Sequence, residues 1–444
     1  MQATPDDTFL YITPIGYRKS LNCGYCRTPG SGHSYFARSS SMTPATYQTL
    51  IDRCWRRSGS LLYKTNQRDA CCPPYTLRVD SSRFRAGRDQ RQAVNRFNKY
   101  VIGDAYAKVA ARLYPKSREQ ARKRDTEFDL VERIHESEAR VLKQPPAPAH
   151  TFTVTLEPDD FTEEKYLLFA NYQQVVHREA PYSTTRSEFR RFLCRSPLKQ
   201  QQFTAPDGRQ RQLGSFHQCY RLDGKLVAIG VLDLLPDCVS AVYFLYHESI
   251  HKFCPGKLGA LQEIALAIEG GYRWWYPGFY IRTCPKMKYK MDFSPQQILN
   301  PDTLEWVDVT QDILSKFDNQ GYLDFGKNGD GTEGATTLPE VRGNADRMSG
   351  VKDDESDEEA SLFHSNMPGI PSLEDMSSLD LDRLFTRLNS ECCYAVDLFD
   401  WHDESIRDKS TTKATVAELV AAVGPEFMDI ICLDFDNPRR DSES

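Results

Sequence analysis

The order of hydrophobic and polar positions predicts an α/β segment over residues 150–325. Thr151 to Leu156 alternates like a half-buried strand, and Glu163 to His177 carries apolar residues at helical spacing. The dipeptide Asp223-Gly224 separates two strand-like runs, which is a strong signal for a β-hairpin. The remaining predicted elements are strands over 217–222, 226–235, 239–246 and 274–281, and a helix over 257–269 that two glycines end.

The segments on either side have different patterns. Residues 83–143 are dense in charges of both signs, which predicts mostly solvent-exposed helix, and residues 144–148 form a proline-rich stretch that predicts a stiff linker. Beyond Gly326 the chain is rich in Gly, Asp and Glu, which predicts flexibility, with short ordered segments as an option at 379–388 and 416–433. The predicted domains are a Cys-rich domain (1–100), a charged helical segment with linker (101–149), a catalytic domain (150–325) and a largely disordered acidic tail (326–444).

The composition of this 444-residue chain is compatible with roughly two to four domains. A mean hydropathy of −0.57 and the lack of an apolar run of about 18 residues argue against a membrane-spanning helix. The residues up to Phe9 do not have the basic and apolar regions of a secretory signal, so we expect a cytoplasmic protein, with the nucleus as a further location. In a reducing compartment the 13 cysteines are better interpreted as thiols or metal ligands than as disulfides.

The formal net charge of −6 conceals a gradient along the chain. Residues 1–150 contain 26 Lys and Arg against 14 Asp and Glu, a net charge of +12. Residues 151–339 have 20 against 23, a net of −3, and residues 340–444 have 10 against 25, a net of −15. The basic first third predicts a surface that faces a polyanion, the alternative being an ordinary solvated surface.

Four cysteines give the clearest candidate for a metal site. A Cys-x-x-Cys turn places two sulfurs on one ion, and a second pair elsewhere completes a tetrahedral thiolate site for zinc or for an iron–sulfur cluster. Here the turn is Cys23 to Cys26, and the second pair is Cys71 with Cys72. The alternatives are a redox-active pair and inert thiols.

Two further segments carry side chains that are suited to chemistry. Asp233 is a carboxylate inside an otherwise apolar strand, so it must pair with a basic group or face a cleft. His217 is a candidate base, the alternative being a hydrogen-bonded core residue. Residues 278–290 interleave cations with aromatics, a composition that suits phosphates, ribose, stacked bases or a substrate carboxylate, or simply a solvated strand end.

Taken together, these blocks resemble the arginyl-tRNA–protein transferase family of eukaryotes. The similarity covers residues 8–100 and 150–325, with changes such as His247-Glu248 where the family usually has Asp-Pro. The blocks that carry it are Cys23-Gly24-Tyr25-Cys26, Trp55-Arg56-Arg57-Ser58-Gly59, Cys71-Cys72-Pro73-Pro74-Tyr75, His217 to Leu226, Gly230 to Pro236, Val242 to Tyr246, and Cys284 to Lys290.

The resemblance implies transfer of arginine from arginyl-tRNA to the N-terminal amine of proteins that begin with Asp, Glu or oxidised Cys. The product is a degradation signal for the ubiquitin pathway. The resemblance also implies an acyltransferase fold of the GNAT type for residues 150–325, and an iron–sulfur cluster or zinc at the N-terminal cysteines. The implied partners are arginyl-tRNA and acidic protein N-termini, with no membrane and no DNA.

For this reaction Asp233 is the first candidate for the base or amine-orienting group, and His217 is the second. The candidates for hydrogen bonds to the oxyanion or the ribose are Tyr243, Tyr246 and Tyr280. The candidates for binding the acidic side chain of the acceptor are Arg221, Lys286 and Lys288. Tyr289 is a candidate for other substrate contacts. Basic residues between Arg83 and Lys99 are expected to hold the tRNA body.

Two other functions remain compatible with the sequence. One is a non-catalytic, metal-stabilised RNA-binding paralogue. The other is a GNAT-type enzyme that uses acetyl-CoA, for which the chain offers only a weak glycine turn at 256–259. Transfer of labelled arginine to a peptide that begins with Asp would distinguish an arginyltransferase from both of these alternatives.

Overall fold

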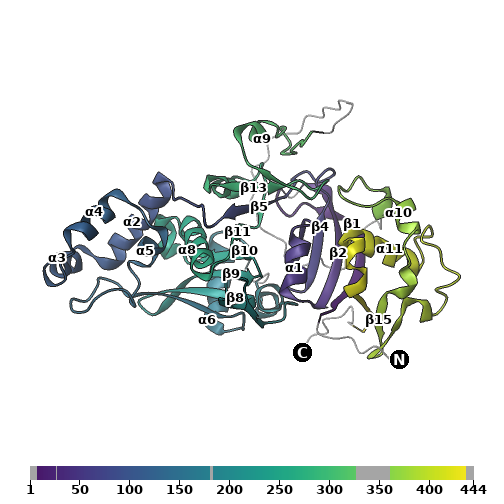
Figure 1. Ribbon diagram of the computed structural model, residues 1–444, viewed down its shortest axis with the longest axis horizontal. Coiled ribbons are helices and arrows are strands. Elements are labelled where there is room, and N and C mark those ends of the chain that lie inside the picture. Colours follow the sequence, from purple (N-terminus) through teal and green to yellow (C-terminus); the bar gives the residue numbers. More distant parts are fainter. Residues whose placement is uncertain (1–7, 27, 181–183, 327–360, 437–444) are drawn as a thin grey trace.

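The computed structural model describes residues 8–26, 28–180, 184–326 and 361–436 (Figure 1). In this part of the chain the longer strands form two sheets. The first sheet has the order β16-β15-β17-β1-β2-β4-β3. Its strands are β1 (Leu10–Asn22), β2 (Pro29–Ser41), β3 (Trp55–Ser58), β4 (Leu61–Thr65), β15 (Phe385–Leu388), β16 (Glu391–Tyr394) and β17 (Ile431–Asp434), with helix α1 (Pro44–Ile51) between β2 and β3.

The second sheet has the order β14-β13-β5-β11-β10-β9-β8-β6, with β12 on β5 and β7 on β8. Asp223 and Gly224 both have positive φ in the tight β8–β9 turn, which confirms the predicted hairpin. The predicted 274–281 strand is interrupted at Pro277 and Gly278. The strands are β5 (Tyr75–Asp80), β6 (Phe152–Pro158), β7 (Gln201–Thr204), β8 (Gln210–Leu222), β9 (Lys225–Leu234), β10 (Cys238–Tyr246), β11 (Trp274–Tyr276), β12 (Phe279–Tyr280), β13 (Gln296–Leu299) and β14 (Trp306–Asp308).

Two helices cover the centre of the second sheet on opposite faces. Leu232 and Leu234 of β9 pack with α8 (Pro255–Gly270), whereas Ile229 and Val231 of the same strand pack with α6 (Glu163–Val175). Alternate residues of a strand point to opposite faces, so the parity of these positions places one helix on each side. The short elements nearby are α7 (Arg186–Phe189), η2 (Arg190–Cys194), η3 (Glu248–Phe253), η4 (Pro285–Asp292) and α9 (Gln311–Ser315).

The prediction of a domain boundary at residue 100 was wrong. Strand β5 lies in the second sheet, where it pairs antiparallel with β11 and β13, so the chain passes from the first sheet to the second well before that residue. Isolated strand patterns do not reveal this, because β5 contributes only six residues whose partners lie about 200 positions later. Residues 1–100 therefore contribute strands to both sheets and do not form a separate domain.

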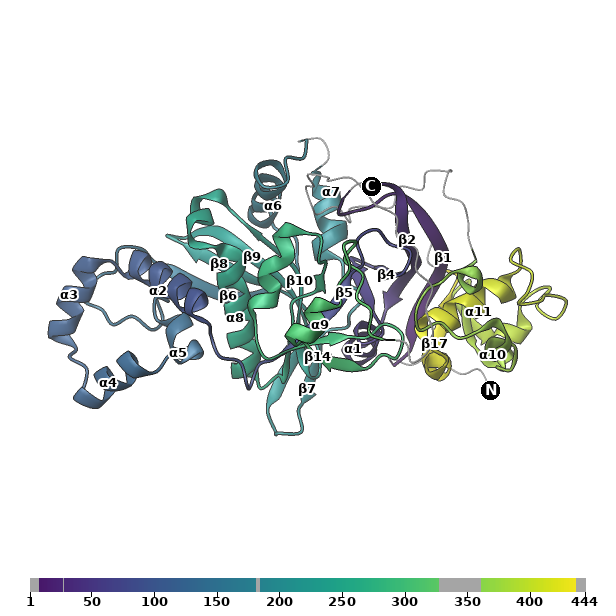
Figure 2. The same ribbon diagram turned by 90° about the horizontal axis from the view of Figure 1, so that it is seen from above.

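Residues 83–143 form the predicted helices, and they extend to one end of the elongated molecule (Figures 1 and 2). The helices are α2 (Arg88–Ile102), α3 (Asp104–Leu113), α4 (Arg118–Thr126) and α5 (Leu130–His135). Helix α4 has no buried residue, and α3 buries only Tyr106. None of the described helices is long and apolar enough to cross a membrane.

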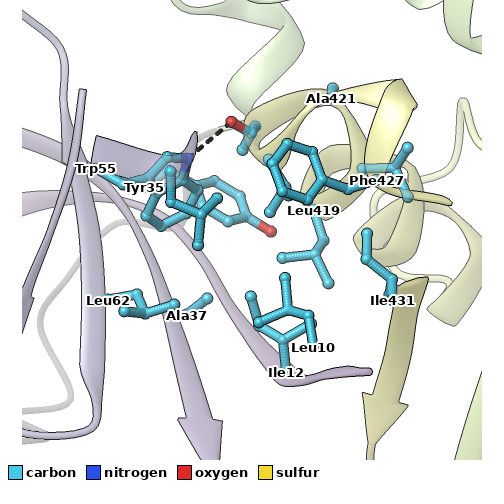
Figure 3. Close-up of a cluster of buried hydrophobic side chains, with 14 of the residues drawn as sticks. Leu10, Ile12, Tyr35, Ala37, Trp55, Leu62, Leu419, Ala421, Phe427 and Ile431 are labelled. Atoms are coloured by element: carbon cyan, nitrogen blue, oxygen red, sulfur yellow. Dashed lines mark hydrogen bonds between the residues drawn. The ribbon is translucent and has the colours of Figure 1, made fainter. Parts of the chain in front are cut away.

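The prediction that the acidic region from residue 326 is mostly disordered was wrong for residues 361–436. They form helices α10 (Leu373–Ser377) and α11 (Thr412–Val423), and β17 pairs parallel with β1. Residues of α11 and β17 pack on Trp55 and Tyr35 of the first sheet (Figure 3), and the Trp55 indole Nε1 donates to the Ala422 carbonyl at 3.1 Å. An apolar helix face forms the core of this acidic region, and the buried Asp434 is paired with Arg387. Residues 327–360 and 437–444 lie outside the described residues.

Candidate functional site

The four predicted metal-site cysteines lie together at the ends of the first sheet. Cys23 and Cys26 are in the β1–β2 turn, and Cys71 and Cys72 precede β5. Their Sγ atoms all lie within 4.8 Å of one another, and those of Cys26 and Cys71 are 3.2 Å apart. Hydrogen bonds from the Cys71 and Cys72 thiols lower the pKa of Cys23, which favours the thiolate form that binds metal ions. This donor set fits a tetrahedral thiolate site.

A buried ion pair joins the two sheets. The Arg57 guanidinium of β3 donates from Nε and Nη2 to the two Asp233 carboxylate oxygens of β9 at 2.8 and 2.6 Å, and Nη2 also donates to Ser215 Oγ at 2.9 Å. Both side chains are buried, with exposures of 1% and 0%. Although burial alone would lower it, the neighbouring Asp233 carboxylate holds the pKa of Arg57 above its usual value. This geometry fixes β3 against β9.

A cavity of about 490 Å³ lies between the two sheets, beside this ion pair. Its walls are aromatic and basic, and among the described lining residues Glu263 carries the one carboxyl group. Tyr25, from the cysteine-bearing turn, also lines it. The principal polar lining residues are Tyr25, Tyr47, Arg56, Arg57 and Tyr63 from the N-terminal part, and Tyr172, Tyr243, Tyr246, His251, Glu263, Lys286, Tyr289 and Lys290 from the second sheet and its helices.

Arg56 and Glu263 are the most unusual residues of this cavity. Arg56 is 7% exposed, and its Nη1 donates to the Trp55 carbonyl at 2.8 Å, but among the described residues its Nε and Nη2 meet no acceptor. Glu263 is 2% exposed and accepts at Oε2 from Trp275 Nε1 at 2.8 Å. Burial raises the pKa of the Glu263 carboxyl to about 7. A guanidinium with two unpaired nitrogens and a buried carboxyl thus belong to residues that line the same cavity.

Both parts of the chain that line this cavity are similar to known proteins. A family model described as "Arginine-tRNA-protein transferase, N terminus" matches residues 21–92, and one described as "Arginine-tRNA-protein transferase, C terminus" matches residues 164–300. Arginyl-tRNA–protein transferase 1 of Saccharomyces cerevisiae is 30% identical over 57% of this chain. The chain belongs to the arginyl-tRNA–protein transferase family.

The relatives of this arginyltransferase-family chain differ in how much of their length is matched. The match spans 49% of the yeast relative, 82% of Arginyl-tRNA–protein transferase 1 of Drosophila melanogaster (26% identical, 68% of this chain) and 74% of that of Arabidopsis thaliana (26% identical, 69% of this chain). The C-terminal domain of a putative lysylphosphatidylglycerol synthetase from Agrobacterium fabrum is similar at 12% identity over 57% of this chain and 55% of that chain, with a TM-score of 0.24. That score is too low to assign a fold type.

Four of the substrate-site residues predicted for this arginyltransferase-family chain line the cavity. They are Tyr243, Tyr246, Lys286 and Tyr289. The Tyr246 hydroxyl lies 3.1 Å from His251 Nδ1, and Lys286 Nζ lies 3.3 Å from His177 Nδ1. Strand β10 and the later segment η4, which is part of the cation–aromatic stretch 278–290, therefore both contribute to the cavity wall.

The other predicted residues do not line the cavity. Both oxygens of Asp233 are engaged by Arg57, and His217 is fully buried with Nε2 2.9 Å from the Leu193 carbonyl. Burial lowers the pKa of His217 to about 4. Neither position supports the predicted role of these two residues as bases, because both side chains lie in the core and outside the cavity lining. Arg221 is paired with Glu157 and Glu164, Tyr280 is buried beside Phe317, and Lys288 is exposed away from the lining.

Sequence reasoning missed the two residues that stand out in the cavity. Arg56 was noted only as part of a matched block, and its neighbour Arg57 has the opposite environment, fully paired. Glu263 lies within the predicted helix 257–269 beside Gln262 and before Glu269, and the local pattern does not show which of these polar side chains is buried. A carboxylate between the apolar positions Leu261 and Ile264 is the signal that could have flagged it, because a buried acid needs a partner or a cleft.

Proposed function

We propose that this chain transfers arginine from arginyl-tRNA to the N-terminal amine of proteins that begin with Asp or Glu, with oxidised Cys as a further acceptor. The observation that carries the proposal is the cavity between the two matched parts, which presents cations and one carboxyl group to a common space. The product is an N-terminal degradation signal of the ubiquitin pathway. The second sheet, with helices on both faces, is proposed to be a GNAT-like acyltransferase domain.

The chemistry needs positioning more than activation. The aminoacyl ester is already activated, and a free α-amino group has a pKa of about 7.7–8.0, so a neutral amine is present near neutral pH. The neutral amine nitrogen bonds to the ester carbonyl carbon, the bond from that carbon to the ribose oxygen breaks, and the one proton that the nitrogen loses passes to this oxygen. Hydroxyl groups of Tyr243 and Tyr246 lie on the cavity wall, where we propose that they donate to the oxyanion or the ribose.

The acidic side chain of the acceptor is proposed to bind Arg56. Its Nε and Nη2 groups form the edge of the guanidinium that binds a carboxylate through two parallel hydrogen bonds. The guanidinium carbon lies 4.8 Å from the Phe279 ring centroid, which fixes its plane at the cavity wall. Arg221, the sequence-based candidate, already has two carboxylate partners.

The cysteine cluster is proposed to bind zinc or an iron–sulfur cluster. Such a group would hold the β1–β2 turn to the segment before β5, and Tyr25 of that turn lines the cavity. Met287 also packs on the cysteines and lines the cavity. The group is therefore proposed to support the cavity wall.

Removal of the metal is expected to lower the rate of arginine transfer, because the cavity wall loses its support. Protein purified anaerobically and aerobically should contain zinc or iron by elemental analysis, and Cys71→Ser should lose most of it together with most activity. Cys254→Ser, at an exposed cysteine of the same protein outside the cluster, should keep both. Protein that is free of metal in both preparations, yet fully active, would remove the metal from the proposal.

The basic helical segment is proposed to hold the tRNA body. Arg88, Arg91 and Lys99 of α2 and Arg118 and Arg122 of α4 are exposed. Phosphate contacts release counterions, so the affinity for tRNA should fall steeply with salt. A flat response would count against this surface.

The transfer assay tests the proposed function directly. The chain is incubated with arginyl-tRNA and peptides that differ only in their first residue, Asp, Glu or Asn. Label should move to the Asp and Glu peptides and much less to the Asn peptide. RNA binding without transfer would support a non-catalytic RNA-binding protein and overturn the proposal.

A further inference from the structure

The arginyl group that is transferred carries a guanidinium, and a buried cation needs an opposite charge. The cavity is otherwise poorly suited to a cation, because Arg56, Arg57, Lys286 and Lys290 all line it. Among the described lining residues, Glu263 carries the one carboxyl group. The lining thus offers several cations to an acidic acceptor and one acid to a basic donor, although Lys290 also lies near that acid.

The helix that carries Glu263 also provides room beside it. Gly256, Ala260 and Glu263 recur at helical spacing on the face of α8 that lines the cavity, so the two positions before the carboxyl have no bulky side chain. The carboxyl itself is held by Trp275 of β11, which donates to Oε2 at 2.8 Å. Among the described residues no hydrogen bond reaches Oε1, which remains able to accept from a ligand.

We propose that Glu263 binds the guanidinium of the arginyl group and so selects arginine among the amino acids that a tRNA can carry. The assignment rests on the proposed function, in which arginyl-tRNA is the donor. Trp275 is a positioning residue in this arrangement, because its indole N–H fixes the carboxyl without reaching the guanidinium. The small face of α8 then accommodates the aliphatic part of the arginyl side chain.

The protonation of Glu263 gives this arrangement a pH dependence. Its neighbours from the surrounding elements are Lys290 of η4, Tyr220 of β8, Trp275 of β11 and Gly230 of β9, and beyond Tyr220 lies Glu138, which is paired with His135 and Arg140. Burial raises the pKa of Glu263 to about 7, whereas the guanidinium binds only the ionised form. The preference for the arginyl group should therefore increase as the pH rises from about 6 to about 8.

The test compares two donors that differ in charge but hardly in shape. Wild-type protein and Glu263→Gln are assayed with arginyl-tRNA and with citrullyl-tRNA, in which a neutral urea group replaces the guanidinium. Glutamine keeps the volume and an oxygen for Trp275. For the variant we expect the kcat/KM for arginyl-tRNA to fall at least about 30-fold, mainly through KM, while the value for citrullyl-tRNA stays within about threefold. The pH dependence of donor preference should disappear as well.

Matched measurements keep the assignment falsifiable. Glu269→Gln makes the same chemical change at an exposed position of the same helix, and both donors should be used as by the wild type. Equal losses with both donors, confined to kcat, would make Glu263 a proton acceptor or a structural residue and would overturn the assignment. Binding of both charged tRNAs is also measured without acceptor. Preference for arginyl-tRNA in binding without any transfer would contradict the proposed function alone, and equal binding of both by the wild type would contradict the role of Glu263.

Discussion

Replacement of Asp233 by asparagine is expected to lower the free energy of unfolding by about 3–5 kcal/mol. The asparagine side chain leaves the Arg57 guanidinium buried at 1% exposure without a counter-charge, and it removes one of the acceptors at 2.6 and 2.8 Å. The loss arises because desolvating a cation is costly unless it is paired. Equilibrium unfolding in urea, followed by fluorescence, measures it, and transfer should fall only as far as the folded fraction falls.

A surface ion pair provides the control for this prediction. Arg68 and Asp302 also form a close pair, but their side chains are 29% and 36% exposed, so Asp302→Asn should cost no more than about 1 kcal/mol. Replacing Asp233 and Arg57 together by leucine and methionine should recover much of the loss, because no unpaired charge then remains. If Asp233→Asn keeps wild-type stability yet abolishes transfer, the carboxylate takes part in the chemistry and the structural interpretation is wrong.

The local pattern along the chain predicted much of the second sheet. Strands β6, β9 and β10 and helices α6 and α8 begin and end close to the predicted positions, since alternation, the Asp223-Gly224 turn and the two glycines after α8 are local signals. Strand β8 ends as predicted but begins seven residues before the predicted start at His217. The position of β5 was not predictable in this way. Its partners follow about 200 residues later, and pairing at that distance leaves no trace in a short window.

The candidate site was predicted only in part, because local spacing is visible in the sequence whereas contacts between distant residues are not. The spacing of Cys23 and Cys26 indicated a shared site directly, and the cluster is assembled. Of the two predicted environments for Asp233, a basic partner or a cleft, the structure shows the first, and the partner is Arg57, 176 positions away in another sheet. Burial of a carboxylate can be inferred from its neighbours, whereas the choice between an ion pair and a cleft depends on tertiary structure.

The acidic C-terminal region shows how an average can mislead. Its net charge suggested flexibility with short ordered segments only as an option, yet Leu419 is fully buried against the first sheet (Figure 3). Val416 and Val420 of the same helix are fully buried as well. Twelve residues of α11 suffice for a helix whose apolar face covers Trp55. Net charge reports on surface, whereas a core requires only a few well-spaced apolar positions.

Replacement of Arg56 by methionine is expected to remove the preference for acidic N-termini. Hydrogen bonds to charged groups contribute about 1.5–3 kcal/mol, so the kcat/KM for a peptide that begins with Asp should fall roughly 10- to 100-fold. The value for the matching Asn peptide should change little, because a neutral amide gains less from the vacant Nε and Nη2 groups. Methionine keeps the contact with the Phe279 ring but donates no hydrogen bond.

The ratio of kcat/KM for the Asp peptide to kcat/KM for the Asn peptide is the decisive quantity, since a general loss of folded protein lowers both values equally. Arg282→Met is the matched control: this arginine is exposed and its guanidinium carbon lies 5.7 Å from the Phe317 ring centroid, but it does not line the cavity. The control should keep the wild-type ratio. A ratio for Arg56→Met that also equals the wild-type ratio would assign recognition of the acid to another cation, and Lys286 and Lys290 at the same wall would then be the residues to replace, because both present ammonium groups to the cavity.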